Sequence, residues 1–116
     1  MDDSQLLKGI LEGIVLKIIS NGETYGYEIL MILEKYGFEN LLEGTLYPIL
    51  TRLNNKGYVK CEKKESPLGP ARKYFSITNE GIKKLEEFKI MYQEITKNTN
   101  RILLEGEEDD GKYRKL

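Results

Sequence analysis

The sequence contains no histidine and no tryptophan, and cysteine occurs once, at Cys61. Without histidine or a cysteine cluster, a transition-metal site is not expected, because these residues supply most of its ligands. One cysteine excludes a disulfide within the chain and fits a reducing compartment, so we expect a cytoplasmic protein. No nucleophile stands beside a recognisable base. We therefore expect no enzyme, no catalytic residue, no metal and no cofactor.

Long hydrophobic runs are also missing. Lys17 and Glu34 interrupt the longest apolar stretches, so neither a transmembrane helix nor a membrane partner is expected. The first four residues include two aspartates, Asp2 and Asp3, and lack the basic-then-apolar order of a signal peptide. With 116 residues, 40% of them hydrophobic and 32% charged, the chain is expected to form one soluble globular unit.

The net charge of −1 conceals a segregation along the chain. Residues 1–42 hold three Lys and seven Asp or Glu, a net charge of −4, whereas residues 43–75 hold seven Lys or Arg and three Glu, a net charge of +4. Residues 76–116 hold eight basic and nine acidic side chains, a net charge of −1. The middle third is therefore the basic surface that a partner rich in phosphate would meet.

Residues 44–57 are the most informative stretch. Four apolar residues recur at helical spacing and predict a helix with one buried face: Leu46, Ile49, Leu50 and Leu53. We expect Thr45 to cap this helix, Pro48 to lie in its first turn and Gly57 to end it. The other face suits phosphate and base-edge contacts; it carries Tyr47, Thr51, Arg52, Asn54 and Asn55. Taken alone, the stretch fits an ordinary amphipathic helix with a solvated polar face better, and it is the surrounding sequence that favours contact with DNA.

Two further helices precede this one. Apolar spacing predicts a helix over residues 5–20, with Ser4 as its cap and more apolar surface than one small core requires. A second helix is predicted over residues 25–36, with Thr24 as its cap and Gly37 at its end. A linker over residues 38–43 then completes a helix-turn-helix arrangement with the helix described above.

After Gly57 the period of the sequence changes. Residues 58–63 and 72–77 alternate as strands do, and the Pro- and Gly-containing stretch 66–70 predicts the loop between them. A hairpin placed directly after a candidate recognition helix makes a winged helix. Lys63, Lys64, Arg72 and Lys73 lie near its tip, within reach of a phosphate or the minor groove. Each lysine alone fits protection of an exposed strand edge better, whereas the group, next to the helix over residues 44–57, favours nucleic acid.

A long helix is predicted from Thr78 to about residue 104. Six residues on it are spaced three, four, three, four and three apart, as in a heptad seam: Leu85, Phe88, Tyr92, Ile95, Thr99 and Ile102. Packing against its own domain would explain the first half of this helix but not the second. We therefore interpret residues 78–104 as a dimerisation helix, residues 1–77 as a winged-helix DNA-binding domain and residues 105–116 as a disordered tail.

Several of these segments together resemble one known family. They are Leu6-Leu7-Lys8-Gly9 with Leu11-Glu12, Tyr25-Gly26-Tyr27-Glu28-Ile29, Gly44-Thr45-Leu46-Tyr47-Pro48 with Arg52-Leu53, and Gly69-Pro70-Ala71-Arg72-Lys73-Tyr74-Phe75 with Thr78 and Gly81. In this order and spacing they resemble the PadR family of bacterial transcriptional regulators over residues 6–95. The resemblance implies a mainly α fold with a small β-hairpin, a winged helix-turn-helix and a C-terminal helix that builds a homodimer, as in the subgroup with one such helix.

The resemblance also implies a function. It implies binding to a double-stranded DNA operator and repression of nearby genes, often efflux or detoxification genes, released by a small ligand. The DNA contacts expected on this chain are Tyr25, Thr45, Tyr47, Pro48, Thr51, Arg52, Lys63, Lys64, Arg72 and Lys73.

Ligand binding is expected at the dimer centre. Multidrug-responsive members of the family stack flat ligands on tryptophans there, and this chain has Tyr92 in the matching part of its helix. A small aromatic effector would then lie against Leu6, Gly9, Phe88, Met91, Tyr92 and Ile95. Simple packing of Phe88 and Tyr92 in the interface is an equally open interpretation. A winged-helix module that binds a protein rather than DNA is the alternative function, because the first and last thirds of the chain are acidic.

Overall fold

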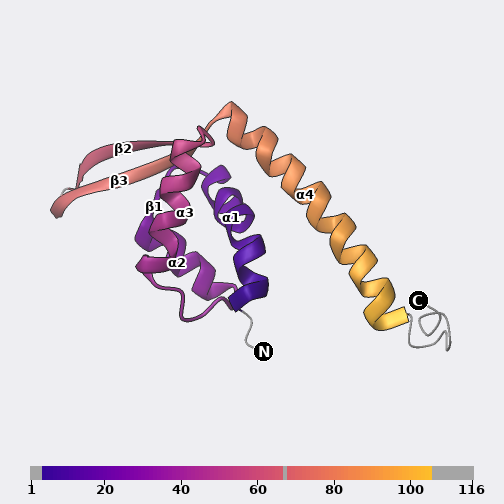
Figure 1. Ribbon diagram of the computed structural model, residues 1–116. Coiled ribbons are helices and arrows are strands. Elements are labelled where there is room, and N and C mark those ends of the chain that lie inside the picture. Colours follow the sequence, from indigo (N-terminus) through magenta and orange to yellow (C-terminus); the bar gives the residue numbers. More distant parts are fainter. Residues whose placement is uncertain (1–3, 67, 106–116) are drawn as a thin grey trace.

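Four helices and a small sheet make up the computed structural model, which describes residues 4–66 and 68–105 (Figure 1). In chain order the elements are α1 (Ser4–Ser20), β1 (Thr24–Tyr25), α2 (Gly26–Lys35), α3 (Glu43–Asn55), β2 (Val59–Ser66), β3 (Gly69–Ile77), α4 (Asn79–Asn100) and the π-helical turn η1 (Arg101–Glu105). The predicted fold class, mainly α with a winged helix-turn-helix, is confirmed. Apart from Glu105, the predicted tail lies outside the described residues.

The core forms where the apolar faces of the first three helices meet the base of the sheet. Its members include Val15, Leu16 and Ile19 of α1, Ile29 and Leu33 of α2, Leu46, Ile49, Leu50 and Leu53 of α3, Val59 and Phe75 of the sheet, and Leu85 of α4. All four apolar residues predicted for the buried face of α3 are therefore in this core. Burial of that stripe fixes the rotation of α3 and turns its polar side outward.

The sheet has three antiparallel strands in the order β1-β3-β2. The predicted hairpin is confirmed, with strands that reach further toward the tip than expected, because β2 continues to Ser66 and β3 starts at Gly69. The third strand was not expected. Thr24 and Tyr25 pair with Phe75 and Tyr74 of β3, so the turn before α2 is attached to the base of the hairpin.

Helix ends were predicted better than helix starts. Gly37 and Gly57 both have positive φ angles, 97° and 79°. The residue after each glycine donates a hydrogen bond to a carbonyl of the helix that has just ended. The N–H of Phe38 donates to the carbonyl of Leu33, and the N–H of Tyr58 donates to the carbonyl of Leu53, both at 2.9 Å. These bonds satisfy carbonyls that would otherwise lack a donor, as in the Schellman motif.

Three predicted N-caps were wrong. Thr24 lies in β1, and its hydroxyl donates instead to the Glu28 carboxylate at 2.6 Å. Helix α3 starts at Glu43, with Leu42 at the cap position, so Thr45 lies in its first turn and Pro48 lies further inside it. Helix α1 begins at Ser4 itself. The acidic Glu43 favours the earlier start of α3, because carboxylates stabilise the positive end of a helix.

The junction between α3 and α4 is tightly connected. The last helix was predicted to run from Thr78, and the structure places this residue at the N-cap of α4, where its hydroxyl oxygen accepts from the N–H of Gly81 at 3.0 Å. The same hydroxyl donates to the carbonyl of Gly57 at 2.6 Å, and the N–H of Thr78 donates to the carbonyl of Tyr58 at 3.0 Å. Any Cβ at position 81 would overlap that Tyr58 carbonyl. Glycine is therefore required there for close packing.

Helix α4 projects from the rest of the molecule (Figure 1). The Cα radius of gyration is 18.0 Å and the principal extents are 64 × 30 × 20 Å, whereas a compact chain of this length would have a radius near ~13 Å. Only the first turns of α4 pack against α1, where Phe88 covers Gly13 so closely that a methyl group on Gly13 would overlap its ring. Within the described residues, none of the helices combines the length and apolar character needed to cross a membrane.

Candidate nucleic-acid interface

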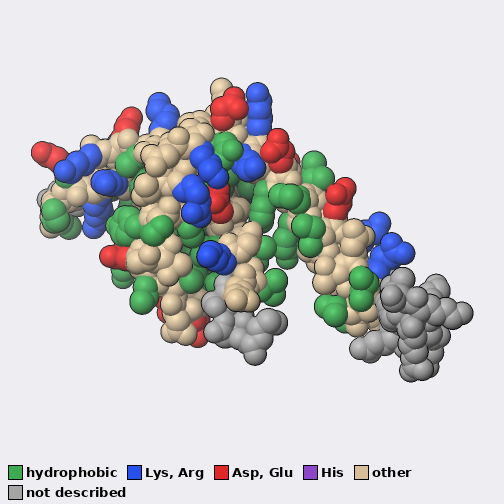
Figure 2. All heavy atoms as spheres, in the orientation of Figure 1, with side chains coloured by type: hydrophobic (Ala, Val, Ile, Leu, Met, Phe, Trp, Pro, Cys, Tyr) green, Lys and Arg blue, Asp and Glu red, His purple; other side chains and the backbone are tan. Residues whose placement is uncertain are grey.

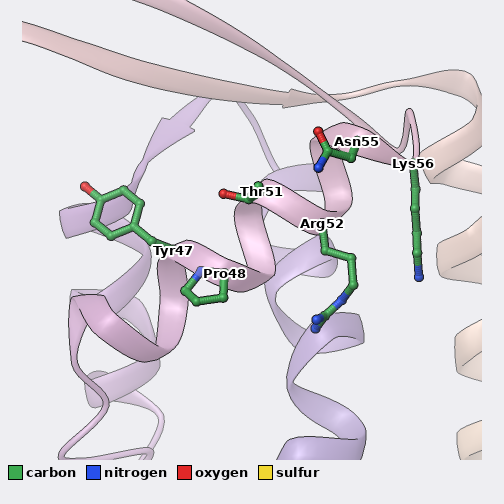
Figure 3. Close-up of a pocket in the computed structure, with 6 residues that line it drawn as sticks. All are labelled: Tyr47, Pro48, Thr51, Arg52, Asn55 and Lys56. Carbon is green, nitrogen blue, oxygen red and sulfur yellow. The ribbon is translucent and has the colours of Figure 1, made fainter.

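The outward side of α3 carries uncharged polar side chains at helical spacing. Tyr47, Thr51 and Asn55 follow one another every four residues, are exposed, and lie on a different side of α3 from Arg52 (Figure 3). With Pro48, Arg52 and Lys56 they line a shallow hollow on the surface. Hydroxyl and amide groups on an exposed helix can donate to and accept from base edges in a major groove, so this side of α3 could distinguish base pairs.

The two cations of that hollow turn the other way, toward α1 (Figure 3). Arg52 donates from Nε to Oε2 of Glu12 at 2.9 Å, and Nζ of Lys56 lies 3.9 Å from Oε1 of the same carboxylate. Their side chains keep about half of their surface exposed, 49% and 50%. The structure thus places Arg52 at the flank of α3, already paired, rather than on its outermost face.

A second hollow lies where the start of α2, the start of α3 and the wing meet. Its lining is Tyr25, Gly26, Tyr27, Glu43, Tyr47, Ala71, Arg72 and Lys73. A Cβ at Gly26 would lie 3.4 Å from the Tyr47 hydroxyl, so the glycine leaves this ring close to the α2 backbone. Four predicted DNA contacts, Tyr25, Tyr47, Arg72 and Lys73, are therefore brought together at one site.

Aromatic rings and one carboxylate contact two cations of the wing. The Arg72 guanidinium lies 4.6 Å from the centroid of the Tyr25 ring, which meets Tyr74 edge-on at 5.5 Å. Lys64 lies 5.6 Å from the Tyr74 ring and donates to both oxygens of Glu23 at 2.8 and 3.0 Å. The hydrogen bond to Glu23 raises the pKa of the Lys64 ammonium. Lys64 is thus paired, whereas Arg72 is oriented by a ring that carries no charge.

The wing also carries cations opposite one another. Lys63 pairs with Lys73 across the ladder, and Lys64 pairs with Arg72 on the next rung. Like charges directly opposite in a sheet repel each other, so an anion beside the hairpin would relieve this repulsion. Figure 2 shows Lys and Arg side chains gathered along the hairpin and over the middle of the body.

Sequence reasoning found most of this surface but missed the acidic residues in it. Glu12, Glu23 and Glu43 were not predicted, although each contacts or adjoins a predicted cation. Lys56 was also missed, although its spacing of four from Arg52 would have indicated a shared face. Thr45 is exposed but lines neither of the two hollows.

The residues expected to bind a ligand lie on α1 and α4. The rings of Phe88 and Tyr92 stack with centroids 6.0 Å apart and planes inclined by 26°. Met91, Tyr92 and Ile95 are exposed along α4, and Leu6 and Gly9 are exposed on α1. Phe88 of α4 contacts Gly13 of α1. One helical turn further from this contact, at Gly9 on α1 and Tyr92 on α4, the helices no longer touch, because nothing lies within 4 Å of a Cβ placed on Gly9. The two helices therefore diverge beyond the contact between Gly13 and Phe88.

Comparison with known proteins agrees with this geometry. The model of the transcriptional regulator PadR-like family matches residues 15–87. A crystal structure of a PadR-like transcriptional regulator from Bacillus cereus is 44% identical, with a TM-score of 0.77, over 86% of this chain and 97% of that one. A Streptococcus transcriptional regulator is 39% identical, with a TM-score of 0.75, over 84% and 96% of the two chains.

Two more distant matches extend the comparison. An uncharacterized protein of Lysinibacillus sphaericus is 30% identical over 89% of this chain and 95% of its own length. Bacillus subtilis PadR, solved in complex with operator DNA, shares the fold at 22% identity and a TM-score of 0.64, over 70% of this chain and 47% of that one. The winged helix, the projecting α4 and the family match over residues 15–87 together show that this chain belongs to the PadR-like family of transcriptional regulators.

Proposed function

We propose that this protein is a dimeric, sequence-specific DNA-binding repressor. The observation that carries the proposal is the outward face of α3, with Tyr47, Thr51 and Asn55, beside a wing whose cations face one another. Such a helix can read base edges while the wing neutralises phosphates. The complex of Bacillus subtilis PadR with operator DNA supports the same use of the shared fold.

The wing assignment is tested by the double variant Arg72→Ala and Lys73→Ala. Binding to all sequences should weaken to a similar degree, and the slope of log affinity against log salt should flatten by about 1 for each phosphate that the wing no longer neutralises. Fluorescence anisotropy at two salt concentrations, with DNA from upstream of its own gene and a scrambled duplex, measures both effects. Thr51→Ala should instead change the preference between the two duplexes.

A matched control removes two charges far from the site. Lys83 and Lys97 lie on α4, away from the hollows and from the predicted seam. The double variant Lys83→Ala and Lys97→Ala should therefore leave DNA binding unchanged. Equal affinity of the wing variant and the unmodified protein would refute the wing assignment. No DNA binding by the unmodified protein at either salt concentration would favour a winged-helix module that binds another protein.

Two-fold assembly is the second part of the proposal. The exposed apolar side chains on the second half of α4 support a helix that pairs with its copy. Two α3 helices would then meet half-sites about 34–36 Å apart, which is one turn of DNA.

Release by a small effector is the third part. A flat aromatic molecule between subunits would lie against Phe88, Met91, Tyr92 and Ile95, with Leu6 and Gly9 at the rim. The stacked pair of Phe88 and Tyr92, and the adaptable thioether of Met91, support such a site. A ligand can bind more tightly to a dimer in which the α3 helices are wrongly separated for DNA. Such a ligand lowers DNA affinity at most by the ratio of its own affinities for the two dimer geometries. Efflux or detoxification genes are the targets such an effector implies, and planar aromatics added to the anisotropy assay would reveal it as released DNA.

A further inference from the structure

One carboxylate of α1 reaches the DNA-facing helix. Glu12, with 28% of its side chain exposed, contacts Arg52 through Oε2 and Lys56 through Oε1, at 2.9 and 3.9 Å. The two cations are one helical turn apart on α3, so a single carboxylate serves both. Forty residues of sequence separate Glu12 from Arg52, and the contact therefore depends on how α1 packs beside α3.

The pairing divides α3 into two sides. Figure 3 shows Arg52 and Lys56 directed toward α1, while Tyr47, Thr51 and Asn55 point elsewhere. Both cations remain about half exposed. They are consequently close enough to the surface to reach a phosphate, yet each lies beside a negative charge that offsets its attraction for one.

Attraction between cations and phosphates is independent of sequence. It supplies nearly all of the affinity for non-specific DNA, and each phosphate neutralised adds about 0.9 to the salt slope. Specificity is the ratio of operator to non-specific affinity. Base contacts hold the operator complex in one register, whereas a non-specific complex can shift to bring every free cation onto a phosphate. Extra cations beside the reading face therefore strengthen non-specific binding more than operator binding and lower this ratio. A carboxylate that offsets two such cations acts in the opposite direction.

We propose that Glu12 is a specificity-determining residue of this interface: it holds Arg52 and Lys56 against α1 and suppresses their sequence-independent attraction for DNA. The inference rests on the DNA-binding function proposed above. Because the pair is exposed, phosphates compete with Glu12 for both cations, and the suppression is graded. Recognition then depends mainly on Tyr47, Thr51 and Asn55, whose contacts differ between base pairs.

Glu12→Gln tests this, because it keeps the shape of the side chain and an oxygen that accepts from Arg52 while removing the charge. The anisotropy assay should show affinity for the scrambled duplex increased by about three- to fivefold, a smaller gain on upstream DNA and a steeper salt slope. The control Glu86→Gln removes a carboxylate paired at 3.2 Å with Lys89 on α4 and should change none of these. Thermal melting confirms that each variant is folded.

A second variant shows whether the gain depends on the α3 cations. When Glu12→Gln is made in a protein that already carries Arg52→Gln and Lys56→Gln, it should give no gain in affinity over that protein. Comparing the effect of Glu12→Gln with and without the two cations is a mutant cycle, which isolates the coupling between these groups. Unchanged affinities and slope in Glu12→Gln, with normal binding by the unmodified protein, would overturn this inference and leave the DNA-binding function standing. Weaker binding by Glu12→Gln would also overturn it, by showing that the charge positions Arg52 for a contact. If neither protein binds DNA, both proposals fail.

Discussion

The two halves of α4 use one helix face in different ways. In the first half, Gly81 and Leu85 are buried, and Phe88 covers Gly13 of α1. In the second half, Tyr92 and Ile95 continue the same seam but are 46% and 60% exposed. The predicted heptad seam therefore begins inside its own domain and ends on the surface. The comparison shows that a regular apolar period identifies a contact face without saying whether the contact lies within a chain or between chains.

The largest effect should come from charge on the exposed half. Ile95→Glu should convert the proposed dimer to monomers, because a carboxylate cannot be buried unpaired against a partner helix. Operator affinity should then fall by about 100-fold or more, as expected when two linked binding events become independent. Light scattering and the anisotropy assay measure the two consequences.

The control for this variant is Gln93→Glu, which adds the same charge on the opposite side of α4 and should leave a dimer. A dimeric Ile95→Glu protein would show that the exposed half does not make the interface. A mass of one chain for the unmodified protein at micromolar concentration would remove the distinction between the two halves altogether.

The next effect belongs to the buried half. Leu85→Ala should lower the free energy of unfolding by about 2–5 kcal/mol, because it leaves a cavity where the side chain is 4% exposed. The folded protein should keep its assembly state. Urea denaturation at one fixed protein concentration measures the loss, since the stability of a dimer depends on concentration.

Ile90→Ala provides the comparison on the same helix. Ile90 is 59% exposed and lies off the seam, so the change should stay within about 0.5 kcal/mol. Equal losses for the two variants would mean that the first half of α4 is not anchored in the core as the structure indicates.

The smallest effect concerns the contact at which the halves divide. Gly13→Ala places a methyl group against the Phe88 ring and should cost about 1–3 kcal/mol of stability. Phe88→Leu in the same chain should recover part of this loss.

Gly9→Ala provides the comparison one turn earlier on α1, where nothing lies within 4 Å of the added methyl group. It should instead stabilise α1 by about 0.5–1 kcal/mol, because alanine favours a helix interior. Thermal or urea unfolding distinguishes the two glycines, and equal effects would refute the close packing of Phe88.

Local patterns predicted much of this fold. The apolar spacing of α3, the glycines Gly37 and Gly57 that end helices, and the start of α4 near Thr78 each depend on residues close together in the chain, so the sequence displays them directly. The strand β1 has only two residues and exists because β3 offers a free edge about fifty residues later. No periodicity can be read from two residues, and Thr24 was accordingly mistaken for a helix cap.

The candidate site was predicted less completely than the fold. Arg72 and Lys73 were identified from charge and motif, and the structure places them beside Tyr25 and Tyr47 as one surface. The partners of the cations were not identified, since Glu12 and Glu23 reach Arg52 and Lys64 across forty or more residues. Charge counted along the chain cannot show which charges are already paired, and that pairing decides how strongly the surface attracts phosphate.

The junction at Thr78 has a mechanical consequence. Its bonds to Gly57 and Tyr58 attach α4 to the end of α3, and α4 then extends for 22 residues, about 33 Å. A rotation of about 5° at this pivot would displace the far end of such an arm by about 3 Å, close to the ~3.4 Å step between base pairs. In the proposed dimer, the stiffness of the junction at Thr78 therefore sets how far the spacing between the two DNA half-sites can vary before the protein no longer fits both.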